Sequence, residues 1–299
     1  MKPEIDINVD DIEVKPTTED KKTDEQEVQS TASDNTKTSS AVNDENDITV
    51  ISKDSPIIIP FGPFASGKSM TLVRISRYLR DKGYTIIPEK SFRAGDEYKK
   101  KCEAFNKAID TKEALPGTAY KDFLLVRVFK QGRSVCQFLE APGEDYFNTK
   151  DTSAENFPRY MTKIIRSLPN RKIWVFIIDA KWDVDEDTRK AYVTRIKNCQ
   201  KKLIKDKDRI VILYNKVDEK DELFDKGHLY IKGAERAMME EYAGLAQLFA
   251  NSNIITRLWR KYNYIFVPFC TGYYKDGYSE SEDSYPERLW NALMKCIRG

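Results

Sequence analysis

From residue 57 to the end of the chain, short continuous apolar runs alternate with runs that have helical spacing. The continuous runs predict buried strands at 57–61, 123–129, 135–139, 172–179, 210–214 and 264–269. Apolar residues three or four positions apart predict helices at 69–80, 188–203, 234–249 and 286–297, and 96–109 is predicted as a more polar helix. The dipeptide Gln131-Gly132 predicts a turn that makes one antiparallel strand pair. Strands separated by helices are typical of a mostly parallel sheet covered on both faces, so we predict a three-layer α/β fold.

Residues 1–54 differ from the rest in composition. They carry six lysines and fifteen acidic residues, a net charge of −9, and the first 60 residues contain no aromatic side chain. Such a segment buries too little apolar surface to offset the entropy lost on ordering. We therefore expect a disordered acidic tail over 1–54 and a folded domain over 55–299. The tail either keeps the protein in solution or binds a partner.

Overall composition narrows the class of protein. The 299 residues include 50 basic and 48 acidic ones, a balance that does not indicate nucleic-acid binding. No apolar run is long enough for a transmembrane helix, and the N-terminus lacks a signal-peptide pattern. The five cysteines form no C-x-x-C pair, which favours reduced thiols in a cytoplasmic protein. The single histidine, His228, argues against a histidine-based metal site or a Ser-His-Asp hydrolase.

The strongest motif directly follows the first predicted strand and matches G-x-x-x-x-G-K-[ST]. In such a phosphate loop, backbone N–H groups and the N-terminus of the next helix face the phosphates. Lys68 is expected to reach the β and γ phosphates, and the Ser69 hydroxyl to bind Mg²⁺. The expected nucleotide-binding residues here are Gly62, Pro63, Phe64, Ala65, Ser66, Gly67, Lys68, Ser69 and Met70. Phe64 either narrows the space near the γ-phosphate or packs outward over the loop.

A second motif, N-K-x-D, follows the strand at 210–214. The carboxylate of Asp218 can accept two hydrogen bonds from guanine, whereas adenine has no matching donor pair and would leave it unpaired. Lys216 can cover the plane of the base, and Asn215 can tie this segment to the phosphate loop. The C-terminal edge of parallel strands is where an α/β sheet binds ligands, so the position supports this interpretation.

With these two motifs, the chain from about residue 55 onward resembles the Ras-like, translation-factor-related P-loop GTPases. The family's D-x-x-G has a counterpart that begins with Glu140, which implies a magnesium contact, directly or through water. The resemblance implies that Gly143 donates its N–H to the γ-phosphate and that Glu144 stands where the Ras branch has its water-orienting glutamine. Lys68, Gly143 and Glu144 are therefore the expected catalytic residues.

Two further positions are expected from the resemblance. Thr118 is expected as the second magnesium ligand beside Ser69 and Glu140, with Thr111 as the alternative. Thr271 follows the last predicted strand and is expected to contact the base through its backbone. The long stretch between the first helix and Thr118, and the P-G-E after the third strand, resemble bacterial double-GTPase-type domains.

These features predict a switch protein that binds GTP or GDP with Mg²⁺, hydrolyses GTP slowly and signals its state to a protein effector or operon partner. A nucleotide-binding module that does not hydrolyse GTP is the main alternative, because Phe64, Glu140 and Glu144 depart from the family pattern. A P-loop ATPase is a weaker alternative, because Asp218 suits guanine. The lysines at 197, 201, 202 and 205 form either a solvated helix face or a docking surface.

Overall fold

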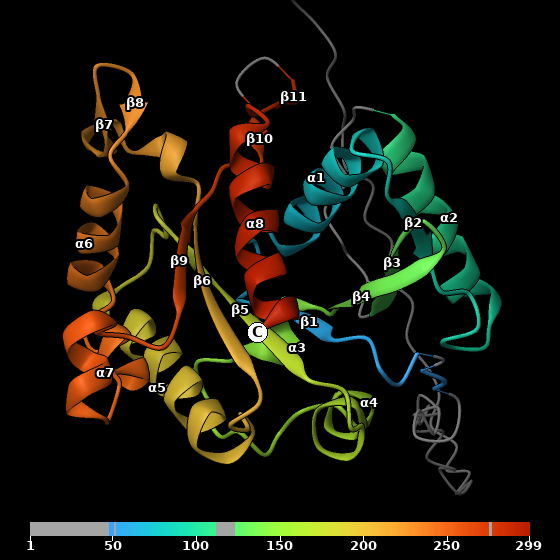
Figure 1. The fold of residues 1–299 in the computed structure, drawn as a ribbon, viewed down its shortest axis with the longest axis horizontal. Helices are drawn as coiled ribbons and strands as arrows, with labels where there is room; N and C mark the ends of the chain where they lie inside the picture. Colours follow the sequence, from blue (N-terminus) through green and yellow to red (C-terminus); the bar gives the residue numbers. More distant parts are fainter. Residues whose placement is uncertain (1–47, 51, 112–122, 275–276) are drawn as a thin grey trace, which may run out of the picture. The chain divides into compact units, whose positions relative to one another are not determined.

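A seven-stranded sheet organises the computed structural model, which describes residues 48–50, 52–111, 123–274 and 277–299 (Figure 1). Its order is β2-β3-β4-β1-β5-β6-β9. The strands are β1 (Ile57–Phe61), β2 (Thr85–Pro88), β3 (Leu124–Lys130), β4 (Arg133–Glu140), β5 (Lys172–Asp179), β6 (Arg209–Asn215) and β9 (Ile265–Pro268). Strands β4, β1, β5, β6 and β9 run parallel, while β3 is antiparallel to both β2 and β4.

Helices cover both faces of this sheet, which gives the predicted three-layer α/β fold (Figure 1). The α-helices are α1 (Lys68–Asp81), α2 (Asp96–Asp110), α3 (Gly143–Tyr146), α4 (Arg159–Thr162), α5 (Glu186–Lys202), α6 (Ile231–Glu241), α7 (Ile254–Trp259) and α8 (Ser284–Arg298). A π-helix, η1 (Lys163–Ser167), continues α4. Short 3-10 helices are η2 (Val217–Glu219), η3 (Asp221–Leu223) and η4 (Ala246–Phe249). Helix α1 packs against both α2 and α8.

Two small hairpins lie outside the main sheet. Strands β7 (Phe224–Asp225) and β8 (His228–Leu229) form one, and β10 (Gly272–Tyr273) and β11 (Ser279–Glu280) form the other. The predicted turn between β3 and β4 is present. Gln131 and Gly132 both have positive φ there, as a two-residue hairpin turn requires.

The central strands supply the core. Every residue of β1 and β5 is buried, as expected for parallel strands covered on both faces. Tyr192 of α5 reaches into this core, and its hydroxyl donates to the carbonyl oxygens of Phe61 and Ile177. Tyr192 thereby links the ends of β1 and β5 where the site forms.

The predicted helix over 234–249 is wrong in its extent. Helix α6 ends at Glu241, and Gly244 then adopts a left-handed conformation with φ of 87°. The chain resumes as the 3-10 helix η4, so two short elements share one apolar pattern. The buried side chains of Met238, Tyr242, Leu245 and Phe249 all still face the core.

The folded domain includes residues before position 55. Ile48 is buried in the core, and the backbone N–H of Thr49 donates to Phe92 O. The carbonyl of Ser52 accepts hydrogen bonds from Gln137 and Asn170. The folded part therefore begins at or before Ile48, N-terminal to the boundary that composition indicates. The rest of the expected acidic tail lies outside the described residues.

Candidate functional site

The predicted phosphate loop lies between β1 and α1, at the carboxyl edge of the sheet. Gly67 caps α1 with φ of 87°, a conformation that favours glycine. A Cβ at this position would also lie 2.3 Å from Asn215 Nδ2. Gly62 is equally confined, because a Cβ there would lie 2.6 Å from Ser66 Oγ. The two motif glycines thus let the loop fold tightly against its neighbours.

The interior of the loop is held by the carbonyl of Pro63. It accepts hydrogen bonds from Lys68 Nζ at 2.8 Å and from Ser66 Oγ at 2.9 Å. Burial lowers the pKa of Lys68 to about 8, while the carboxylates of Glu140 and Glu144 act in the opposite direction. An anion placed in the loop would favour the protonated lysine, so this ammonium is suited to meet phosphate.

The N-K-x-D segment comes from the end of β6 and lies directly beside this loop. Asn215 is fully buried, and its Nδ2 donates to Ser66 O at 2.9 Å, as the sequence predicts. Lys216 adopts a left-handed conformation and pairs with Asp179 Oδ2 at 2.5 Å. The Asp218 carboxylate lies near Cys270, whose pKa is raised by burial and by this negative charge.

Ser69 and Glu140 are the pair expected to hold a metal, and they lie together. Ser69 Oγ donates to Glu140 Oε1 at 2.6 Å, while Glu140 Oε2 is 3.5 Å from Lys101 Nζ of α2. A hydroxyl and a carboxylate beside a phosphate loop are oxygen donors of the kind Mg²⁺ prefers, so these residues fit that ion. Within the described residues, no group of three or more His, Cys, Asp or Glu side chains is arranged to hold a metal ion.

The structure treats differently the two threonines expected as alternatives for the second magnesium ligand. Thr118 lies outside the described residues. Thr111, the alternative, ends α2, and its Oγ1 donates to Lys107 O at 3.0 Å. It does not line the cavity described below, so the structure does not place it with Ser69 and Glu140.

Gly143 begins α3 and touches the phosphate loop. A Cβ at this position would lie 2.3 Å from the Phe64 backbone nitrogen, so the close approach requires glycine. The neighbouring Glu144 is exposed and lines the same cavity. Phe64 is 63% exposed and also lines this cavity, so its ring lies at the rim.

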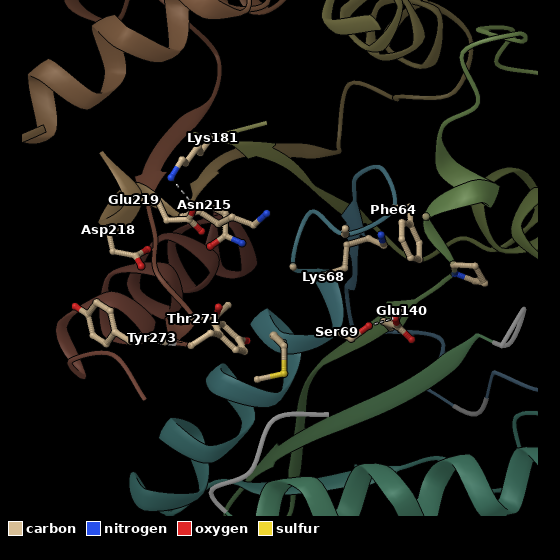
Figure 2. A pocket seen from close by; sticks show the side chains of 18 of the residues that line it. Phe64, Lys68, Ser69, Glu140, Lys181, Asn215, Asp218, Glu219, Thr271 and Tyr273 are labelled. Carbon is tan, nitrogen blue, oxygen red and sulfur yellow. Dashed lines mark hydrogen bonds and ion pairs between the residues drawn. The ribbon is translucent and has the colours of Figure 1, made fainter. Parts of the chain in front are cut away.

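These residues surround one cavity of about 850 Å³ (Figure 2). Lys68, Ser69 and Glu140 lie at one end, and Asp218 and Thr271 at the other. The predicted residues that line it are Phe64, Ala65, Gly67, Lys68, Ser69, Met70, Glu140, Gly143, Glu144, Asn215, Lys216, Asp218 and Thr271. Gly62, Pro63 and Ser66 do not line it and instead shape the loop from within.

Several lining residues were not predicted. Lys181 and Glu219 flank the N-K-x-D end and form an ion pair at 3.6 Å. Tyr273 and Tyr274 come from β10 and the residue after it. Their aromatic side chains, separated from Thr271 by Gly272 alone, were the available signal, since ligand pockets are commonly lined by aromatic side chains.

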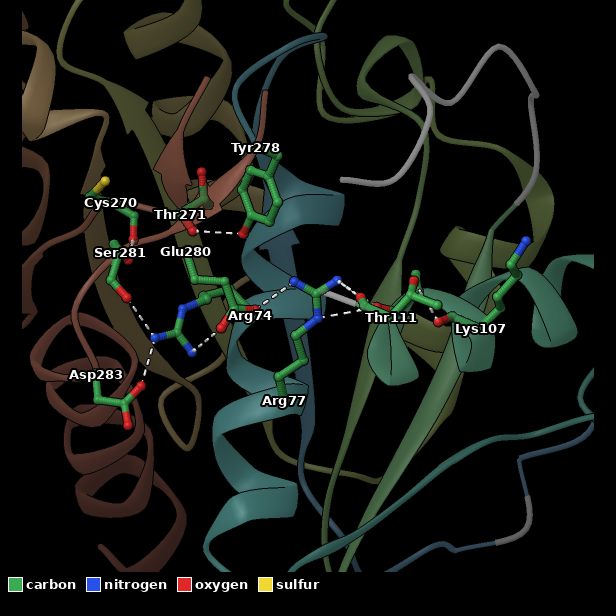
Figure 3. A network of polar contacts seen from close by, with 11 residues as sticks. Arg74, Arg77, Lys107, Thr111, Cys270, Thr271, Tyr278, Glu280, Ser281 and Asp283 are labelled. Atoms are coloured by element: carbon green, nitrogen blue, oxygen red, sulfur yellow. Dashed lines mark hydrogen bonds and ion pairs between the residues drawn. The ribbon is translucent and has the colours of Figure 1, made fainter. Parts of the chain in front are cut away.

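A polar network holds the Thr271 side of the cavity against α1 (Figure 3). Buried Arg74 donates to Ser281 O at 2.9 Å and to Asp283 at 2.7 Å. Arg77 contacts Glu280 at 2.5 Å and also donates to Thr111 O. Because α1 also carries Lys68, these contacts fix both ends of the cavity relative to each other.

The remaining sequence-based expectations concern cysteines and membranes. All five cysteines are free and buried, in agreement with reduced thiols. In the part of the chain that the structure describes, no helix is long and apolar enough to cross a bilayer.

No protein-family model matches the sequence, and no curated protein matches it. Solved structures do resemble the fold. Roco2 RocCORdC from Methanosarcina barkeri, bound to GDP, is 11% identical with a TM-score of 0.35; the match covers 82% of this chain and 49% of that one. The Ski7 GTPase-like domain from S. cerevisiae, bound to GDP and inorganic phosphate, is 15% identical with a TM-score of 0.41, covering 81% and 50%.

A third similar structure is the apo form of the translation elongation factor SelB from Methanococcus maripaludis. It is 11% identical with a TM-score of 0.31, and the match covers 82% of this chain and 34% of that one. The chain thus spans half or less of each of these solved proteins. At such identities these similarities concern the fold alone.

Proposed function

We propose that this protein is a guanine-nucleotide-binding switch that binds GTP with Mg²⁺ and hydrolyses it slowly to GDP and phosphate. The observation that carries the proposal is the single cavity lined by both motifs, with Lys68 and Ser69 at one end and Asp218 at the other. The hydrogen bond from Asn215 to Ser66 O joins the two ends directly. A nucleotide with its phosphates in the loop would then bring its base to Asp218.

In the proposed complex, different residues of the chain contact the phosphates, the base and the metal. The loop amides and Lys68 stabilise negative charge on the phosphates, and Lys68 exchanges its bond to Pro63 O for a phosphate oxygen. Asp218 accepts hydrogen bonds from guanine, while the stem of Lys216 covers one face of the base. Ser69 and Glu140 hold the metal, which would neutralise charge on the β and γ phosphates.

Gly143 and Glu144 carry the proposed switch and the chemistry. Gly143 approaches the phosphate loop closely at Phe64, which supports the proposal that its N–H responds to a γ-phosphate. Loss of that phosphate would release α3, a four-residue helix, and a protein partner would detect the change. Glu144, exposed at the cavity, is the group proposed to orient the attacking water.

A nucleotide-binding module without hydrolysis is the second candidate. Lys101 already neutralises one oxygen of Glu140, and Glu144 would bring negative charge toward the γ-phosphate. Both features favour a site that binds nucleotide but stabilises the transition state weakly. An ATP-specific site is disfavoured, because adenine would leave Asp218 without hydrogen-bond donors.

The test is single-turnover GTP hydrolysis with Mg²⁺, with nucleotide binding measured on the same sample. Wild type is compared with Glu144→Ala and with a matched control, Glu186→Ala, at an exposed position in α5. The switch-enzyme proposal predicts slow cleavage that Glu144→Ala slows further and the control does not. Binding without cleavage would support the second candidate, and absence of guanine-nucleotide binding would contradict both.

A further inference from the structure

Helix α7 carries three large apolar side chains that other parts of the described chain leave uncovered. Ile255, Leu258 and Trp259 are 71%, 81% and 90% exposed. They are spaced i, i+3 and i+4, so they share one face of the helix. Single exposed apolar residues are ordinary, but three together, including an almost fully exposed tryptophan, mark an interaction surface.

The segment that bears this face is anchored at its base. Ala250 and Tyr262 form an antiparallel bridge, and the backbone N–H of Asn251 donates to Lys261 O at 3.1 Å. Asn251 Nδ2 also donates to Arg260 O at 2.5 Å. Phe249 and Tyr264, which flank the segment, are buried. The apolar face is therefore presented on a closed loop that emerges from the core.

Three basic residues lie within or directly after α7 in the sequence. Arg257, Arg260 and Lys261 are exposed, and no described carboxylate lies within ion-pair distance of any of them. Arg260 also borders a groove of about 1090 Å³ that Lys205, Arg209 and Lys295 line. Three acidic residues line the same groove: Asp206, Asp208 and Glu235. Asp208 accepts hydrogen bonds from the backbone N–H groups of Lys172 and Lys205, and Glu235 accepts one from the Tyr264 hydroxyl. The surface around α7 therefore presents cations that are available to an anionic partner.

We propose that α7 docks the protein onto an anionic lipid surface. Trp259, Leu258 and Ile255 enter the boundary between headgroups and acyl chains, while Arg257, Arg260 and Lys261 meet lipid phosphates. Tryptophan and leucine on one face with lysine and arginine beside them are the composition of interfacial membrane elements. The 44 basic and 33 acidic residues after position 54 give this part of the chain a charge of the right sign.

A protein partner fits this surface less well. The core of a protein–protein interface is depleted in charged residues, lysine in particular, and standard interfaces involve 20 to 30 residues a side. Here three apolar side chains lie beside three cations that form no ion pair with the described carboxylates. An anionic bilayer satisfies both groups at once, since it offers an apolar interior beneath a charged layer.

The experiment is co-sedimentation of the full chain with phosphatidylcholine vesicles with and without phosphatidylserine, at low and high salt. We expect binding to the phosphatidylserine vesicles that salt weakens. Trp259→Ser should reduce the partition coefficient for phosphatidylserine vesicles about tenfold or more. The double variant Arg257→Ser, Arg260→Ser should reduce it about tenfold or more at low salt. Tyr230→Ser, at an exposed aromatic that directly precedes α6, is the matched control and should bind like wild type.

A second readout keeps the test independent of sedimentation. Trp174 and Trp290 are buried and Trp182 is half-buried, so an emission blue shift on adding vesicles should come mainly from Trp259. Equal binding by wild type and Trp259→Ser, or no binding to either vesicle, would overturn the proposal. So would a wild-type dimer that Trp259→Ser converts to monomer, because the face would then contact a second copy. Nucleotide binding, measured on the same samples, tests the proposed function separately.

Discussion

Gly143→Ala tests the contact between α3 and the phosphate loop. The added Cβ would lie 2.3 Å from Phe64 N, 2.5 Å from Phe64 Cα and 2.6 Å from the carbonyl carbon of Pro63. All three are backbone atoms, so no side-chain rotation relieves the overlap. Restoring ordinary contact requires a separation of about 1 Å, and over-packing of this kind costs about 1 to 3 kcal/mol.

The effect on nucleotide binding depends on whether the phosphate loop or α3 moves to relieve the overlap. The loop is fixed between β1 and α1 and by the bond from Asn215, whereas α3 is four residues long. We therefore expect residue 143 to retreat and its N–H to lose the γ-phosphate. A hydrogen bond to a charged group contributes about 1.5 to 3 kcal/mol, which corresponds to a roughly tenfold to hundredfold loss of GTP affinity. GDP affinity should change little, because GDP has no γ-phosphate.

The assay is titration of wild type and variant with GDP and with a non-hydrolysable GTP analogue. Gly233→Ala is the control. Its added Cβ would meet only the side chain of Tyr230, which can rotate, and Gly233 does not line the cavity. Equal losses for both nucleotides would mean that the loop itself is distorted. Unchanged affinities would refute the proposed role of this glycine. Either result would contradict the reasoning.

Two further predictions concern Lys101, which is half-buried, and Lys172, which is buried. Lys101→Met leaves the Glu140 carboxylate without its cation, so we expect the free energy of unfolding, measured by thermal unfolding, to fall by about 2 to 3 kcal/mol. In the presence of GDP and Mg²⁺ this decrease should be much smaller, because the metal would replace the lysine as the cation beside Glu140. Lys100→Met, which removes an exposed ion pair with Glu97, is the control. An equal decrease for Lys101→Met with and without GDP and Mg²⁺ would argue against a metal beside Glu140. Burial lowers the pKa of Lys172 to about 8, so the unfolded chain binds the extra proton between pH 8 and 10.5. As pH rises through that window, the free energy of unfolding of wild type should therefore increase by up to about 3 kcal/mol relative to that of Lys172→Met. Urea titrations in which this difference stays constant with pH would contradict the prediction.

Much of the fold was predictable because its central strands are continuous apolar runs. The runs at 57–61 and 172–179 became β1 and β5 with the same bounds. Strand β2 was not predicted, since four residues at a sheet edge with mixed exposure give a weak pattern. The single helix expected over 234–249 failed for another reason. Buried residues with helical spacing can lie on two elements, and the left-handed Gly244 that separates them leaves the spacing unchanged.

The candidate site was predictable where a motif has fixed spacing. The phosphate loop and N-K-x-D residues converge on one cavity, joined by Asn215 and Ser66. Lys101 was not foreseen, because its contact with Glu140 depends on how α2 packs and no local pattern encodes that. The tyrosines after Thr271 were missed similarly, since the β10–β11 hairpin that presents them pairs two residues of each strand.

The measurement that tests guanine recognition most directly is calorimetric titration of wild type and Asp218→Asn with GDP, ADP and XDP. We predict that wild type prefers GDP over ADP by roughly hundredfold or more, because adenine leaves the Asp218 carboxylate unpaired. The variant should bind GDP more weakly and XDP more tightly, since the asparagine amide can donate to the second carbonyl of xanthine. Equal affinity of wild type for GDP and ADP, or an unchanged preference in Asp218→Asn, would contradict the assignment of this cavity to guanine nucleotides.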